Sequence, residues 1–200
     1  LKEAYPDAKP ELNFTSPFEL LVATMLSAQC TDKQVNKTTA VLFPLYNTPE
    51  AFASLSEEEL APYIRSCGFY QTKGKNIIAA SKIIVEQYGG QVPRGRDELT
   101  KLPGVGRKTA NVVVSNAFGV PAIAVDTHVF RVSHRLGLAK GADPLATEKE
   151  LQKAIPMEKW SDAHHWLIWH GRKICKARKP LCSECMLIEL CPYKEKNFAK

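Results

Sequence analysis

The fold is decided by the stretch LPGVGRK at residues 102–108. A proline and two glycines cannot continue a helix, yet apolar helical spacing precedes this stretch and helix-forming residues follow it. We therefore predict a tight hairpin between two helices. Backbone N–H groups at such a turn lie at the positive end of the following helix dipole, so the hairpin is expected to bind an anion.

The charge of the chain favours a phosphate as that anion. The 200 residues carry a formal net charge of +6, and residues 170–200 hold eight Lys or Arg against three Glu. Nearly the whole excess therefore lies at the C-terminus, which predicts a basic patch. The hydrophobic content of 44% is enough for a core of one large or two small domains, so disorder is not expected.

Helix start and stop signals recur along the whole chain. Capping side chains, often followed by proline or an acidic residue, predict helix starts near residues 16, 31, 48, 56, 126 and 143, and Met157-Glu158 predicts another. Long helices are expected over 70–88 and 108–118, although the three valines of the second could form a strand if taken alone. No segment shows convincing period-two alternation between turns, so we predict an all-α protein of roughly ten helices.

Lys108 falls in the first turn of the helix that follows the hairpin. The helix dipole and partial burial would both favour its neutral amine, which is the form that attacks carbonyl-like carbons and gives Schiff bases. Most lysines at helix starts are only solvated, and position alone does not exclude that interpretation.

Asp126 is the candidate partner of Lys108. The helix over 108–118 would be about 15 Å long, and residues 119–125 span about 23 Å when extended, so the chain can return to the hairpin. Asp126 could cap the next helix, or stabilise positive charge on a sugar and help remove the proton from the lysine ammonium. Both roles can hold together.

Four cysteines lie within seventeen residues near the C-terminus, in the order C-x6-C-x2-C-x5-C with a proline after the last. We interpret them as metal ligands, because cysteines in a reducing compartment are not expected to form disulfides. Zinc sites usually pair two C-x2-C units, whereas a closing Cys-Pro is typical of ferredoxin-type runs, so the spacing favours a 4Fe-4S cluster over zinc. The ligands are Cys175, Cys182, Cys185 and Cys191, and the loop between the first two carries Lys176, Arg178 and Lys179, which we expect to contact a phosphate backbone.

The hairpin LPGVGRKTA, the run VDTH at 125–128 and the cysteine spacing together resemble the endonuclease III family of helix-hairpin-helix DNA glycosylases with lyase activity. The resemblance covers essentially the whole chain. It implies two helical domains with a DNA cleft between them. One is a six-helix barrel at 10–121 that carries the hairpin, and the other is a discontinuous iron–sulfur cluster domain made of 1–9 and 122–200.

The resemblance also implies an activity and its residues. Lys108 would be the nucleophile and Asp126 the essential carboxylate of a bifunctional glycosylase and AP lyase in base excision repair. The implied substrate is duplex DNA with an oxidised pyrimidine, flipped out of the stack, or an abasic site. Lys108 would displace the base, and β-elimination from the resulting imine would cut the strand.

The resemblance also implies further site residues, whose surrounding sequence motifs are less specific. The hairpin residues Gly104, Val105, Gly106 and Arg107 would hold DNA. Gln29 would fill the gap left by the flipped nucleotide, and Phe69 matches a second wedge position, where leucine is expected in some relatives. Ser27 and His128 are candidates for the substrate pocket.

Two rival interpretations remain at this point. One is a non-catalytic helix-hairpin-helix module that only binds DNA. The other is an adenine-removing relative, which lacks the nucleophilic lysine. We expect a cytoplasmic protein, because no apolar run approaches membrane-spanning length and the first residues, Leu1-Lys2-Glu3, carry no signal peptide. We also expect it to be bacterial, monomeric and associated with the nucleoid.

Overall fold

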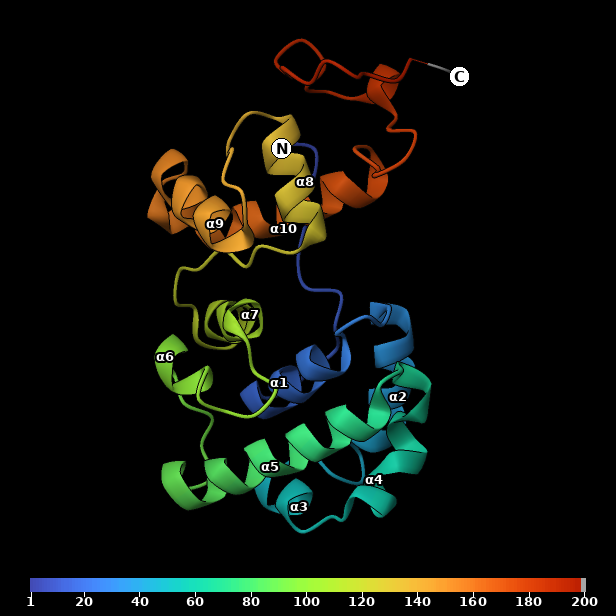
Figure 1. Cartoon of the computed structure of the whole chain (residues 1–200), viewed down its shortest axis with the longest axis vertical. Coiled ribbons are helices and arrows are strands. Elements are labelled where there is room, and N and C mark those ends of the chain that lie inside the picture. The colour runs from blue at the N-terminus through green and yellow to red at the C-terminus, as the bar shows by residue number, and fades with distance from the viewer. Residues whose placement is uncertain (199–200) are drawn as a thin grey trace. The chain divides into compact units, whose positions relative to one another are not determined.

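The computed structural model describes residues 1–198, and these form ten α-helices, a few short 3-10 turns and no strand (Figure 1). The predicted all-α class is therefore confirmed. The chain divides into two compact units. Pro10–Val120 is called the hairpin unit, and Leu1–Lys9 together with Pro121–Lys200 is called the cysteine unit.

The hairpin unit contains seven α-helices. Four of them start at a serine or threonine whose side chain accepts a hydrogen bond from a first-turn N–H, as the capping signals predict. The elements are α1 (Pro17–Leu26), α2 (Asp32–Leu42), α3 (Pro49–Ala53), α4 (Glu57–Ile64), a 3-10 turn (Arg65–Cys67), α5 (Tyr70–Tyr88), α6 (Arg96–Leu99) and α7 (Arg107–Phe118).

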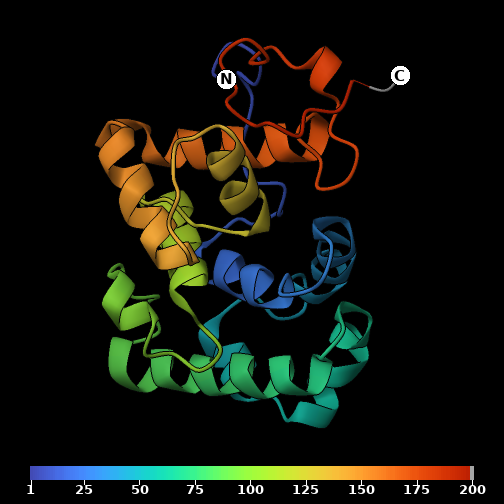
Figure 2. The same cartoon turned by 45° about the horizontal axis from the view of Figure 1, so that its top comes forward.

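The core of the hairpin unit is built around α1. Residues 18–26 are buried without interruption, and α1 contacts α2, α5 and α7 (Figure 2). The valines at 112–114 are buried within α7, so the helical interpretation of that run is confirmed. Burial on several sides explains why α1 is apolar around most of its circumference.

The cysteine unit is organised by α8 (Thr127–Arg135) packed against α10 (Trp160–Lys173), with α9 (Pro144–Ala154) beside α8. Its buried core includes Ile123, Val129, Val132, Leu151 and Leu167. The N-terminal segment belongs here, because the Tyr5 hydroxyl lies 3.1 Å from His170 Nδ1 and the indole of Trp169 donates to the Lys9 carbonyl at 3.4 Å.

One predicted helix start is wrong. Met157–Lys159 forms a 3-10 turn, and the α-helix begins only at Trp160. The preceding Pro156 supplies no capping side chain, and the Trp160 indole N–H donates to the Ile155 carbonyl at 2.9 Å, which fixes the later start. None of the helices in the described part of the chain has the length and apolarity that a membrane crossing requires.

Candidate active site and nucleic-acid interface

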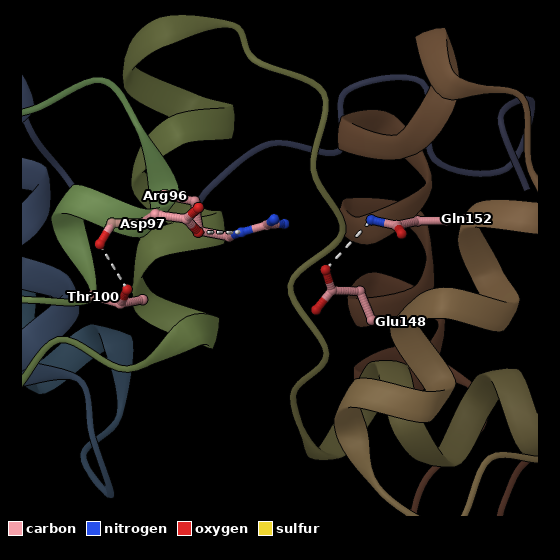
Figure 3. Close-up of polar contacts among 5 residues, drawn as sticks. All are labelled: Arg96, Asp97, Thr100, Glu148 and Gln152. Carbon is pink, nitrogen blue, oxygen red and sulfur yellow. Dashed lines mark hydrogen bonds and ion pairs between the residues drawn. The ribbon is translucent and has the colours of Figure 1, made fainter.

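The predicted hairpin joins α6 to α7. α6 ends at Leu99, because the Lys101 and Leu102 amides donate to carbonyls three residues back and tighten the chain. The Thr100 hydroxyl donates to the Asp97 carbonyl at 3.0 Å and helps to end the helix (Figure 3). The chain therefore enters the turn at residues 102–106 soon after α6 ends.

Two glycines shape the turn in different ways. Gly104 has φ +74°, and a Cβ there would lie 2.9 Å from Asn76 of α5, so both conformation and space require glycine. Gly106 precedes α7 with φ −86° and would place a Cβ in open space. Because Gly106 caps α7 without a side chain, the start of this helix is open to an external acceptor. Val105 between them is buried and anchors the turn.

Lys108 is the second residue of α7, and it is exposed. The partial burial expected from the sequence is therefore wrong. Lys108 lies in the first helical turn, two residues after Gly106, where a Cβ would meet no other atom within contact distance. Its amine is accessible to a large substrate, as an attack on DNA requires. The adjacent Arg107 is half-buried.

Asp126 is the N-cap of α8, and its Oδ1 accepts a hydrogen bond from the Val129 amide at 2.7 Å. The capping interpretation is confirmed. The bond fixes the half-buried carboxylate at the positive end of the helix dipole. Asp126 belongs to the cysteine unit, and Lys108 belongs to the hairpin unit.

His128 is the second residue of α8 and is held by Arg131. The Arg131 guanidinium donates to His128 Nδ1 at 3.2 Å, to the Gly171 carbonyl at 2.9 Å and to the Cys175 carbonyl at 3.1 Å. Burial lowers the pKa of His128, and the Asp126 charge opposes that effect. Arg131 was missed from the sequence, because its carbonyl partners lie 40 and 44 residues away.

Gln29 and Phe69 meet at one pocket of the hairpin unit. Both have left-handed backbones, with φ +53° and +47°, and Phe69 is 68% exposed. The pocket measures about 280 Å³, and its walls also include Gly104 of the hairpin and Lys73 of α5. Ser27 lies apart from this pocket's walls as the C-cap of α1, with its hydroxyl donating to the Thr24 carbonyl at 2.8 Å. The structure thus brings both wedge candidates and the hairpin together.

The four C-terminal cysteines all line one pocket of the cysteine unit. Burial raises the pKa of the Cys185 thiol, and charge on the other three cysteines raises it further, as expected when four sulfurs share one site. In residues 1–198, no three His, Cys, Asp or Glu side chains stand at the spacing of a single metal ion. Four cysteine sulfurs in one pocket are the donor set of an iron–sulfur cluster, and also of a four-cysteine zinc site.

Arg135 ties the loop after Cys175 to α8. Its guanidinium donates to the Lys176 carbonyl at 2.7 Å and the Ala177 carbonyl at 3.1 Å, and it lies 3.5 Å from Cys175 Sγ. The loop's basic side chains, Lys176, Arg178 and Lys179, are exposed. They form the predicted basic patch on a backbone that Arg135 holds at Lys176 and Ala177. The role of Arg135 was not predicted, because its partners are backbone carbonyls far along the chain.

Comparisons with known proteins agree with this geometry. Residues 22–157 match the model of the HhH-GPD superfamily, base excision DNA repair proteins. The chain is 56% identical to endonuclease III of Bacillus subtilis (strain 168), over 99% of this chain and 91% of the relative. It is 53% identical to endonuclease III of Escherichia coli (strain K12), over 98% and 93%.

A solved structure described as a trapped endonuclease III–DNA covalent intermediate superposes with a TM-score of 0.92 at 55% identity. The match covers 96% of this chain and 90% of that one. These findings favour the enzyme over the non-catalytic DNA-binding module. The chain belongs to the endonuclease III family of the HhH-GPD superfamily, and it is a base excision repair DNA glycosylase with AP lyase activity.

Proposed function

We propose that Lys108 is the nucleophile of this glycosylase and lyase. The observation that carries the proposal is its exposed amine in the first turn of α7, directly beyond the hairpin. The neutral amine attacks C1′ of the damaged nucleotide, the bond from C1′ to the base breaks, and the base leaves with the bonding electrons and takes a proton. The sugar ring opens to an imine on Lys108. Loss of a C2′ proton then expels the 3′ phosphate by β-elimination.

Asp126 acts on the same sugar. Its carboxylate stabilises positive charge that develops as the base departs and helps to take the proton from the Lys108 ammonium. The capping bond to the Val129 amide holds the carboxylate in one orientation and lowers the entropy lost on positioning it. This role requires that Asp126 reach the nucleotide bound at the hairpin.

The substrate is duplex DNA with an oxidised pyrimidine or an abasic site. Amides at Gly104, Gly106 and Arg107 hold a phosphate beside the lesion. The Val105 amide donates to the Leu102 carbonyl at 3.1 Å, so Val105 contributes by holding the turn that presents the others to DNA. Gln29 and Phe69 fill the space left by the flipped nucleotide, and Phe69 is suited to stacking because it is 68% exposed. Ser27 and His128 contact the base. The enzyme acts as a monomer on the bacterial chromosome, with residues 10–121 as the hairpin domain and 1–9 with 122–200 as the cluster domain.

The four cysteines hold a 4Fe-4S cluster. When bound, the cluster cross-links Cys175, Cys182, Cys185 and Cys191 and so fixes the loop that presents the basic patch to phosphates. Arg135 orders the same loop from α8. Brown protein with about four irons per chain supports this assignment, whereas colourless protein with stoichiometric zinc contradicts it.

Borohydride trapping tests the nucleophile. Duplex DNA with one abasic site is mixed with the protein and reduced, so that an imine becomes a stable cross-link. The unaltered protein is expected to give a covalent band, and Lys108→Gln to bind DNA without one. Lys101→Gln is the matched control, because Lys101 is also exposed and lies directly before the hairpin. A covalent band from Lys108→Gln would overturn the assignment.

A further inference from the structure

Lys73 of α5 is a buried lysine that the mechanism above does not use. Its side chain is 7% exposed, and its Nζ donates to the Leu26 carbonyl at 2.8 Å and to the Cys67 carbonyl at 2.6 Å. Burial lowers the pKa of Lys73, while the nearby thiols of Cys30 and Cys67 raise it. A buried ammonium is retained only where hydrogen bonds compensate its lost hydration, so these two carbonyls are essential partners.

Both carbonyls close a helical element. Leu26 is the last residue of α1, and Cys67 is the last residue of the 3-10 turn that follows α4. The last carbonyls of a helix lack intrahelical partners and lie at its negative end, where a cation is favourable. Lys73 therefore joins the ends of two elements that are 41 residues apart in the sequence.

Each of these ends leads directly into a strained residue. Gln29 lies three residues after Leu26, and Phe69 two after Cys67. In residues 1–198, only three non-glycine residues have positive φ, and these are two of them. Left-handed backbone is costly for side chains with a Cβ and persists only where the surroundings hold it. Phe69 is too exposed for its own packing to do so.

The same helix also supports the hairpin. Asn76 lies one turn beyond Lys73 on α5, and its side chain lies beneath Gly104. Lys73, Asn76, Gln29, Phe69 and Gly104 all line the 280 Å³ pocket. One face of α5 thus supports all three loops around this pocket. It contacts the hairpin through Asn76, and through Lys73 it holds the loops that carry Gln29 and Phe69.

We propose that Lys73 is a positioning residue for DNA opening. By holding the Leu26 and Cys67 carbonyls it keeps Gln29 and Phe69 in the backbone conformations from which they enter the duplex. The inference rests on the proposed wedge function of these two residues. Loss of the ammonium relaxes both loops and slows nucleotide flipping, while the chemistry at Lys108 proceeds at its normal rate once a sugar is accessible.

The test compares two DNA substrates under single-turnover conditions. In a duplex, an abasic site must be extruded and the gap filled, whereas in a single strand it is already accessible. Lys73→Met, which is similar in length but has no donor, is expected to cut the duplex cleavage rate about tenfold, equivalent to ~1.4 kcal/mol. The single-strand rate should be unchanged. The fluorescence rise of 2-aminopurine placed beside the lesion should slow by the same factor.

Two further variants exclude a merely structural role. Ser81→Ala removes another buried hydrogen bond from α5, away from the pocket, and should leave the duplex-to-single-strand ratio unchanged. Lys73→Arg keeps a buried cation with donors and should restore part of the ratio. Equal losses on both substrates, or an unchanged ratio in Lys73→Met, would overturn the inference.

Phe69→Ala and Gln29→Ala separate this inference from the proposed function. If neither changes the duplex-to-single-strand ratio, the wedge function itself is wrong. If both change it and Lys73→Met does not, only the role of Lys73 is wrong. If Lys73 acts through Phe69, the double variant loses less than the sum of the two single losses.

Discussion

Replacement of Asp126 by asparagine or alanine separates its two roles. The carboxylate caps α8 through one 2.7 Å bond to the Val129 amide. Asparagine preserves that bond, so Asp126→Asn should keep the free energy of unfolding within ~0.5 kcal/mol. Asp126→Ala removes it and should cost about 1 kcal/mol. If the charge takes part in catalysis, both variants lose turnover by a similar factor, on the order of 100-fold to 10,000-fold.

Asp143 provides a matched control within the same unit. It caps α9 with a bond of 2.8 Å to the Ala146 amide and takes no part in the proposed site. Asp143→Ala should lose the same ~1 kcal/mol as Asp126→Ala while cleaving DNA at the normal rate. Any loss of turnover in Asp126→Ala beyond that of Asp143→Ala then cannot come from a weakened helix start.

The assays are urea denaturation for stability and single-turnover cleavage of duplex DNA carrying one oxidised pyrimidine. Saturating enzyme is used, so that the rate reports bond breaking rather than binding. Full turnover in Asp126→Asn would refute the catalytic role and leave a cap alone. A large loss in Asp126→Ala with none in Asp126→Asn would lead to the same conclusion.

Three other predictions concern the hairpin, the basic loop and a buried histidine. Gly104→Ala should destabilise the protein by ~1 kcal/mol or more and weaken DNA binding, because its φ is +74° and Asn76 blocks the Cβ, whereas Gly106→Ala should fold normally. Joint replacement of the exposed loop cations by glutamine should reduce the slope of log K against log salt by about 2.7; these are Lys176, Arg178 and Lys179. Burial lowers the pKa of His165 to about 4 in the folded protein. As the pH falls, this imidazole therefore becomes protonated in the unfolded chain before it does in the folded one. Stability should be complete above about pH 6.5 and fall by up to ~3 kcal/mol toward pH 4, less so in His165→Gln.

Each of these has an outcome that contradicts it. Equal stability of Gly104→Ala and Gly106→Ala in urea would show that the turn tolerates a side chain. An unchanged salt slope in filter binding would remove the loop from the DNA contact. An identical pH dependence of unfolding in the His165 variant would mean that this imidazole is not protonated preferentially in the unfolded chain.

Local chemistry explains what could be predicted from the sequence. A capping side chain such as Ser16 or Thr31 acts on amides two or three residues away, so its effect can be read without the fold. The hairpin was predictable for the same reason, since proline and glycine restrict or free the backbone where they stand. The late start of α10 was missed because it depends on a bond from the Trp160 indole, which no capping pattern reports.

The contacts that position the site are mostly long-range, and these could not be predicted. Arg135 reaches carbonyls 41 and 42 residues away, and Lys73 reaches one that is 47 residues away. The helical period does place Lys73 on the buried face of α5 with Ile77 and Ile84, which marks it as unusual. Its acceptors are backbone carbonyls, however, and every residue carries one. The residue types in the sequence therefore do not identify which carbonyls Lys73 contacts.

Because Lys73 binds backbone acceptors, the loops that carry Gln29 and Phe69 can change in sequence during evolution. Because Lys73 binds main-chain oxygens of Leu26 and Cys67, the side chains at these positions and at 29 and 69 can change without loss of its bonds. Phe69 can therefore replace a smaller apolar residue at the tip while the loop keeps its left-handed backbone. We expect Phe69→Leu to cleave duplex DNA within about threefold of the unaltered rate, because it retains an apolar wedge on the same support. Phe69→Gly should lose far more, since it removes the wedge and frees the backbone that Lys73 holds.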